Sequence, residues 1–377
     1  MPTPYPREAS FIRMKTFVLI VLTLAISLSA FSQAKPMTQA EYVKMLYGLQ
    51  KDPATKSDIV DALRQRGIDF VITDGLRSLT RSKGANDEEL KSAFEEAGRR
   101  QKDPEAAKLP PASEANALLE KSRQVTREAI DQMPDFVVKQ IIARSEAFAG
   151  TGNWKPIDTV VIAVSYSSEK GEQYQVLAMN GAPVQAQKGN SYSNIEGSTT
   201  GGEFVEALEK LFRPESKTAF TLVTTDTIRN QHALVYDFEI LVENNRNGGV
   251  GFKTSKGANG YAFTSVPAGE KGRVWIDRKT GNVLKLEFAA TNIPADFQVR
   301  AYTSAIDYDW VNIAGERVLL PITSDNRFTS VAGNQTFQDR NYIRFREYQK
   351  FGSEVRILDD DAKPDPAPSP SPGPEKP

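Results

Sequence analysis

The stretch Arg273–Phe288 (RVWIDRKTGNVLKLEF) constrains the fold more than any other part of this sequence. Apolar and polar residues alternate on both sides of Lys279–Asn282, and this period of two predicts an antiparallel hairpin with a tight turn. Gly281 suits the left-handed backbone conformation that such a turn needs. One face of the hairpin is apolar and comprises Val274, Ile276, Leu284, Leu286 and Phe288. The opposite face is charged apart from Trp275, so we expect it to face water while the apolar face covers a core.

The chain around this hairpin changes from helical to strand periodicity at Asp135. Apolar residues recur at helical spacing between residues 38 and 101, and Ser113 is expected to cap a longer helix that ends near Gln132. From Asp135 onward the apolar residues alternate, which predicts a series of long antiparallel strands. One amphipathic helix, at residues 201–212, interrupts these strands. Its apolar side comprises Phe204, Leu208, Leu211 and Phe212.

Strands in sequential order, with helices before and among them, predict an α+β fold. We expect a large curved antiparallel sheet, or half-barrel, wrapped on helices and preceded by a small all-helical module. The embedded helix should lie across the open face of the sheet, because its apolar side needs a core. The predicted organisation is a signal peptide (1–34), a helical module (35–104), a linker (105–112), the half-barrel (113–358) and a disordered Pro-rich tail (359–377).

The N-terminal segment 1–34 has the pattern of a secretion signal. Arg13 and Lys15 precede an uncharged and mostly apolar run, Phe17–Ala30, which is as long as a signal core and short for a membrane span. Ser32–Ala34 supplies small residues for cleavage, and Met14 is an alternative start. We therefore expect an exported protein of the periplasm, the cell envelope or the outside. Once the signal is removed it should not be an integral membrane protein; an uncleaved anchor is the alternative.

Composition excludes several classes of function. The chain has 377 residues with a formal net charge of −1, so no global positive field attracts nucleic acid, and no nucleic-acid partner is expected. Cysteine is absent, which excludes disulfides, thiolate catalysis and cysteine metal sites. The single histidine leaves little for a zinc site or a histidine-based triad. We expect no metal and no cofactor.

The hairpin resembles the WxDxxTGxxLxxE element of periplasmic lipoprotein-carrier-like proteins, the LolA/RseB-type half-barrels. The matching residues are Trp275, Asp277, Thr280, Gly281, Leu284 and Glu287. The order of elements also fits: an amphipathic helix, a run of strands, an interposed helix, then the hairpin and further strands. This resemblance implies binding of an apolar or amphipathic ligand, such as a lipid or acyl chain, between the concave sheet and its helices.

A second resemblance is to uncharacterised exported proteins of soil bacteria, especially acidobacteria. It rests on Pro134–Phe136, on Gly202–Phe204, on the hairpin and on Leu319–Pro321, and it covers about residues 113–358. The chain departs from the carrier family, which is a single compact domain, by its helical module and tail. No position matches a known lipid-contact residue, so the resemblance assigns no ligand-binding residues.

His232 is the first candidate for chemistry. It shares a strand face with Leu234 and the apolar residues that follow, which favours a partly buried, hydrogen-bonded histidine over a general base. The carboxylates nearest in sequence are Asp226, Asp237 and Glu239. A pair of them could serve a glycosidase, but surface charges are the simpler interpretation.

Three further patterns are open to a binding interpretation. The glycine-rich segments Gly248–Gly251 and Gly257–Gly260 lack the Lys-Ser/Thr step of a phosphate loop and predict a mobile loop or loose hairpin. The sequence period places Arg340, Tyr342, Arg344, Arg346, Tyr348 and Lys350 on one strand face, which is either solvated or grips an anionic headgroup or polysaccharide. Asp359–Asp361 either binds a hard cation weakly or is a solvated linker.

Two hypotheses of function follow. The first is an exported, non-enzymatic binding protein that holds a lipid, an acyl chain or another apolar ligand in the half-barrel, with a lipid or lipoprotein as partner. The second is a structural or protein-interaction module of the cell envelope with a filled core, an envelope protein as partner and no small ligand. The size of the concave cavity distinguishes them, because a cavity of roughly several hundred Å³ suits a ligand site and a filled core suits the second hypothesis. An enzyme ranks third.

Overall fold

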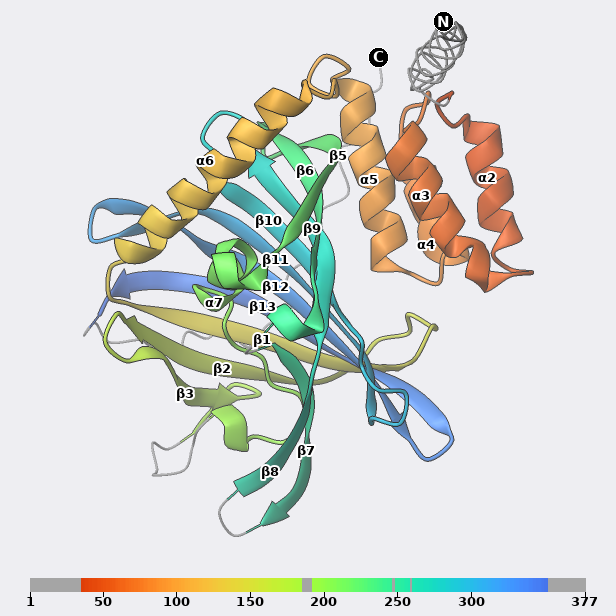
Figure 1. Ribbon diagram of the computed structural model, residues 1–377. Coiled ribbons are helices and arrows are strands. Elements are labelled where there is room, and N and C mark those ends of the chain that lie inside the picture. Colours follow the sequence, from red (N-terminus) through yellow and green to blue (C-terminus); the bar gives the residue numbers. More distant parts are fainter. Residues whose placement is uncertain (1–34, 185–191, 246–247, 258–259, 352–377) are drawn as a thin grey trace, which may run out of the picture.

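The computed structural model describes residues 35–184, 192–245, 248–257 and 260–351. An antiparallel sheet of eleven strands, in the order β4-β3-β2-β1-β13-β12-β11-β10-β9-β6-β5, forms the body of the molecule. It curves strongly and does not close, so β4 and β5 are its edges (Figure 1). A separate two-stranded hairpin pairs β7 with β8. The predicted α+β fold, a large curved antiparallel sheet with helices, is confirmed.

The strands of the large sheet are β1 (Phe136–Phe148), β2 (Lys155–Ser167), β3 (Gly171–Met179), β4 (Ala182–Pro183), β5 (Ala219–Ile228), β6 (Gln231–Ile240), β9 (Gly269–Asp277), β10 (Val283–Thr291), β11 (Val299–Ile313), β12 (Glu316–Ala332) and β13 (Gln335–Lys350). The small hairpin is β7 (Gly249–Gly257) and β8 (Gly260–Pro267). The α-helices are α2 (Gln39–Gly48), α3 (Lys56–Arg66), α4 (Asp74–Lys83), α5 (Glu88–Lys102), α6 (Ala112–Asp131) and α7 (Glu206–Phe212).

Three of the N-terminal helices begin at residues whose side chains cap them, whereas α3 has no side-chain cap. Thr38, Thr73 and Asp87 each accept a hydrogen bond from a backbone N–H in the first turn of α2, α4 and α5 respectively. The helix α6 begins differently from the prediction. It starts at Ala112 directly after Pro111, whose fixed φ suits a helix entry, and Ser113 lies inside the first turn.

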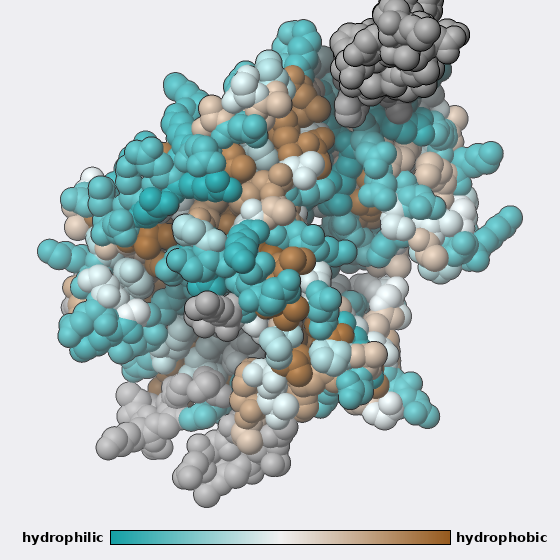
Figure 2. Space-filling view, in the orientation of Figure 1, coloured by the Kyte–Doolittle hydropathy of each residue, from teal (hydrophilic) through white to brown (hydrophobic). Residues whose placement is uncertain are grey.

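The helices α6 and α7 cover the concave face of the sheet (Figure 1). Apolar residues of both helices pack on β6, β9, β10 and β11 in one large cluster. A second cluster lies over β1, β2 and β13, and Phe204 belongs to it. Since Phe204 leads into α7, this short segment joins the two clusters. The outward surface of α6 is mostly hydrophilic, with hydrophobic residues beneath it where the helix meets the sheet (Figure 2).

The helix α5 covers the opposite, convex face at β5, β6 and β9. Asp226 of β5 accepts two hydrogen bonds from the Arg99 guanidinium, at 2.7 and 2.9 Å, and one from the Trp275 indole N–H at 3.0 Å. The prediction that the charged face of the central hairpin faces water is therefore wrong. Trp275 is 1% exposed, and the Arg273 side chain, 14% exposed, lies 3.7 Å from Glu96 of α5. Tertiary packing explains the difference, because charged residues of α5 pair with oppositely charged residues of the strands.

Two bulges change which face of the sheet a residue occupies. Between the pairs Val283–Ile276 and Lys285–Trp275, β10 has one extra residue, so Leu284 joins the convex cluster around Trp275 instead of the concave core. Near the end of β13, Glu347 has a φ of +55° and the pairing with β1 shifts. Tyr348 consequently packs in the concave cluster and donates a hydrogen bond to the Pro321 carbonyl. The predicted arginine and tyrosine face is therefore not continuous.

Some predictions lie outside the described residues. These are the signal peptide (1–34), the Pro-rich tail (359–377) with Asp359–Asp361, and a final strand near Val355–Leu358. Among the residues that the structure describes, no helix is long and apolar enough to span a membrane.

The contact between Asp226, Arg99 and Trp275 predicts a measurable stability effect. Asp226→Asn should lower the free energy of unfolding by roughly 1–3 kcal/mol. The substitution removes the charge of a buried carboxylate that accepts hydrogen bonds from a guanidinium and an indole. Chemical denaturation followed by circular dichroism measures this.

The matched control is Asp237→Asn. Asp237 also pairs with an arginine, at 2.9 Å from Arg273, but its side chain is 48% exposed. Its loss should cost less than about 1 kcal/mol. Equal effects of the two substitutions would contradict the assignment of Asp226 as the main polar contact between module and sheet.

Candidate functional site

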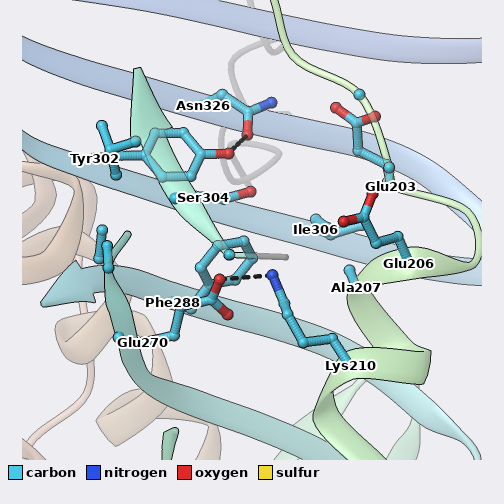
Figure 3. Close-up of a pocket in the computed structure, with 18 residues that line it drawn as sticks. Glu203, Glu206, Ala207, Lys210, Glu270, Phe288, Tyr302, Ser304, Ile306 and Asn326 are labelled. Atoms are coloured by element: carbon cyan, nitrogen blue, oxygen red, sulfur yellow. Dashed lines mark hydrogen bonds and ion pairs between the residues drawn. The ribbon is translucent and has the colours of Figure 1, made fainter. Parts of the chain in front are cut away.

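A pocket of about 150 Å³ lies on the concave side of the sheet (Figure 3). Its walls come from the segment entering α7, from α7 itself, from strands β9 to β12 and from the base of the β7–β8 hairpin. The side chains that define its chemistry are Glu203, Glu206, Lys210, Glu270, Phe288, Tyr302, Ser304 and Asn326. It therefore lies in the region where the apolar clusters of the concave face leave room for polar groups.

Glu203 is the most unusual group of the pocket. It is 3% exposed, and neither carboxylate oxygen has a hydrogen-bond partner among the described residues. Burial raises the pKa of Glu203 to about 7, and the charge of Glu172 adds to this rise, while Thr200 and Asn326 offset only part of it. A carboxylate that is buried without a partner is unstable, so Glu203 is either protonated or ready to meet a ligand.

Backbone contacts hold Glu203 in this position. The Gly202 N–H donates to the Glu172 carboxylate and to the Tyr174 hydroxyl, at 3.2 Å each, and the Tyr174 hydroxyl also donates to Glu172. Gly202 has a φ of +85°, a conformation that a side chain disfavours. Burial raises the pKa of Glu172 as well. The chain entering α7 is thus fixed on β3 one residue before Glu203.

The only ammonium of the lining is already paired. Lys210 of α7 lies 2.6 Å from the Glu270 carboxylate, with both side chains about nine-tenths buried. The same ammonium lies 5.4 Å from the centre of the Phe288 ring. On the other wall, the Tyr302 hydroxyl donates to Asn326 at 3.0 Å, and Asn326 donates to Ser324 at 2.8 Å. Lys210 therefore does not neutralise Glu203.

The hairpin residues predicted from the family resemblance lie away from this pocket. Asp277 accepts hydrogen bonds from the backbone of Lys279 and Thr280 and from the Thr280 hydroxyl, which closes the turn. Gly281 has the expected positive φ, +82°. Trp275 and Leu284 belong to the convex cluster, and Glu287 pairs with Lys285 at 2.6 Å. In this structure the six residues build the hairpin and its convex contact.

His232 also lies outside the pocket. Its side chain is 50% exposed and its Nδ1 is 3.9 Å from Asp103, beyond hydrogen-bond distance, so the predicted partly buried, hydrogen-bonded histidine is instead exposed. The residue stands at the start of β6, beyond the part of the strand that the helices cover. Asp226 contacts Arg99 and Trp275 on the convex face, and Asp237 pairs with Arg273. The structure does not assemble these groups into a catalytic site.

The other candidate patterns are partly structural. Arg340 binds Asp325 through two hydrogen bonds of 2.9 and 2.8 Å and lies over the rings of Trp154 and Tyr342. The glycine-rich stretch forms the β7–β8 hairpin, and Gly248 and Gly249 line the pocket. Among the described residues, no group of three or more His, Cys, Asp or Glu side chains has an arrangement that could hold a metal ion.

Sequence reasoning did not identify the groups that define the pocket. The sequence marks Glu203 only as the middle residue of Gly202–Phe204, and no motif marks Lys210, Glu270, Tyr302 or Asn326. A signal was nevertheless present: Gly201-Gly-Glu203-Phe places a carboxylate between a flexible glycine pair and a residue of the core. Its burial depends on strands far away in the sequence.

Comparison with known proteins gives structural similarity only. No protein-family model matches the sequence, and no curated protein matches it. A LolA superfamily protein from Nitrosomonas europaea is 13% identical with a TM-score of 0.28, over 65% of this chain and 95% of that one. A DUF1329 family protein from Desulfovibrio piger is 8% identical with a TM-score of 0.29, over 64% and 94%. MucB, solved in complex with MucA, is 10% identical with a TM-score of 0.16, over 63% and 94%.

The resemblance to LolA-type proteins that the hairpin predicts is therefore also found between structures. At such low identity and TM-score it says nothing about the pocket, whose chemistry follows from this chain's own residues.

The raised pKa of Glu203 predicts a pH-dependent stability. Its pKa is about 7 in the folded chain against a reference of 4.5, so the folded state binds more protons between these values. The stabilising contribution is complete below about pH 4.5 and is lost as the pH rises through about 7. Relative to Glu203→Gln, which cannot titrate, the wild type should lose roughly 3 kcal/mol of unfolding free energy between pH 4.5 and 8.

Urea denaturation of both proteins across this range measures the difference. Glu206→Gln is the matched control, since Glu206 lies three residues further on and is exposed at the rim of the pocket. It should follow the wild-type profile. Parallel profiles for wild type and Glu203→Gln would show that Glu203 is not buried as a neutral acid.

Proposed function

We propose that this chain is an exported, non-enzymatic binding protein of the half-barrel type, and that its ligand site is the pocket at Glu203. The observation that carries the proposal is a buried carboxylate without a hydrogen-bond partner on the wall of a cavity. Leaving such a group unsatisfied costs about 1–3 kcal/mol or more. Cavities that combine apolar walls with a few convergent polar groups of shifted pKa are typical of binding sites.

The size of the pocket limits the ligand. About 150 Å³ accommodates a group of roughly the size of benzene, whereas pockets for drug-sized ligands measure about 300–1,000 Å³. The concave face on either side is occupied by α6, α7 and Phe204. A lipid or acyl chain, the ligand implied by the family resemblance, would place only its polar end here. We therefore propose a small ligand, or the polar end of an amphipathic one.

The filled concave face also supports the second candidate, a protein-interaction module of the cell envelope. Its apolar residues pack against the chain's own helices, so the concave face is largely filled among the residues that the structure describes. In this alternative the Glu203 pocket holds water only, and a protein partner binds elsewhere on the molecule. Export is proposed in both cases from the signal-like segment 1–34.

The absence of catalysis is proposed from the composition of the pocket. Its lining contains no histidine and no cysteine. The carboxylates present, Glu203, Glu206 and Glu270, have no nucleophile-and-base arrangement around them: Glu270 is paired with Lys210 and Glu206 is exposed. Binding is the simpler use of this site.

Native mass spectrometry of the chain purified from a bacterial periplasm, combined with organic extraction, tests the proposal. We expect a co-purified small molecule at one per chain that denaturation releases. The Glu203→Gln variant should carry less of it, whereas Glu209→Gln, an exposed change on α7, should carry as much as the wild type. A full complement of ligand on Glu203→Gln would place the site elsewhere, and a bare chain that takes up no ligand would favour the interaction module.

A further inference from the structure

The charges around the pocket indicate which chemistry it recognises. Its lining carries three carboxylates, Glu203, Glu206 and Glu270, against one ammonium, Lys210. Lys210 and Glu270 neutralise each other at 2.6 Å. When Glu203 is ionised, the pocket therefore has a net negative charge, and Glu172 behind Glu203 adds to it. The carboxylates of the lining would repel an anionic ligand group, and the one lysine is already paired with Glu270.

Glu203 has no well-formed hydrogen bond among the described residues, although the side chains of Thr200 and Asn326 lie close enough to lower its pKa. Both of its oxygens lack a hydrogen-bond donor among the described residues, although it is almost completely buried. The nearby Asn326 directs its oxygen to Tyr302 and its nitrogen to Ser324. A neutral hydroxyl group would satisfy an oxygen but would leave the charge uncompensated. A group with several N–H donors and a positive charge meets both requirements.

The same pocket already contains one ammonium group that a carboxylate binds beside an aromatic ring. The Lys210 ammonium binds the Glu270 carboxylate and lies 5.4 Å from the centre of the Phe288 ring. Carboxylate and aromatic ring together bind ammonium groups favourably. Glu203 offers a second carboxylate in the same cavity, without a cation.

A metal ion is a poorer occupant than an organic cation. Divalent ions need several ligands within one coordination sphere, and no such cluster exists among the residues that the structure describes. The cavity is also larger than a bare ion needs, because about 150 Å³ leaves room for a short carbon chain beside Phe288 and Ile306.

We propose that the pocket at Glu203 binds a primary ammonium group attached to a short apolar stem. This inference rests on the proposed ligand site and specifies the chemical class of its ligand. The ammonium lies against the Glu203 carboxylate, and the stem lies along the apolar wall. Such a group occurs in small free amines and in the headgroups of aminolipids, and the two sources share this chemistry.

Isothermal titration calorimetry of the full chain at pH 8 in phosphate buffer, which contains no competing amine, provides the test. The probes are n-butylammonium, 1-butanol and butanoate, which have similar stems and different charges. We expect n-butylammonium to bind at least tenfold more tightly than either of the others. Glu203→Gln should weaken n-butylammonium at least tenfold and 1-butanol much less, so that the charge selectivity is lost, whereas Glu209→Gln should change neither.

The outcomes separate this inference from the proposed function. If no probe binds, the ammonium assignment is overturned, and the ligand site itself stands or falls with the mass-spectrometry result. If 1-butanol or butanoate binds as tightly as n-butylammonium, the pocket stands as a ligand site and the ammonium assignment is overturned. If n-butylammonium binds equally well to Glu203→Gln, Glu203 is not its partner. The comparison of the three probes on the wild type tests the ammonium assignment even if the Glu203→Gln variant fails to fold.

A short-chain lipid with an ammonium headgroup, dihexanoyl phosphatidylethanolamine, distinguishes the two sources. Tighter binding than that of n-butylammonium, with the same dependence on Glu203, supports an aminolipid. Equal or weaker binding with that dependence supports a small free amine. Binding that does not depend on Glu203 overturns the assignment for the lipid.

Discussion

Both faces of the sheet must be covered around β6, β9 and β10, and this constraint organises the molecule. The concave face of these strands is apolar and takes α6 and α7. The convex face carries Trp275 and several charges, and it takes α5 through Asp226, Arg99 and Glu96. A sheet buried on both sides needs a helical layer on each. The N-terminal module is therefore part of the packing of the half-barrel, and it is not an independent appendage.

The pocket exists because this packing is incomplete at one place. The short helix α7 is preceded by a non-helical segment fixed on β3, which separates Phe204 from the apolar side of α7. Between the two clusters the wall is built from Glu203, Tyr302, Ser304 and Asn326 instead of aliphatic residues. Polar groups in such a position weaken the core unless they are hydrogen-bonded.

Features that depend on local sequence could be predicted. Thr38, Thr73 and Asp87 cap helices, and such caps can be predicted because they involve only neighbouring residues. The strands follow from alternation, and the turn of the hairpin follows from Gly281. Features that depend on distant residues could not be predicted: the bulges at Leu284 and Glu347 arise from pairing with β9 and β1. The burial of Trp275 and Glu203 likewise requires α5, β3 and β12 to be in place.

The two edges of the open sheet have a consequence for the behaviour of the chain in a crowded compartment. An unpaired edge strand can recruit a strand from another molecule and start aggregation. At one edge, β4 has two residues and ends at Pro183, which has no N–H to donate. At the other edge, β5 lies against α5 and α3. The sheet can thus stay open at both edges without offering a template for polymerisation.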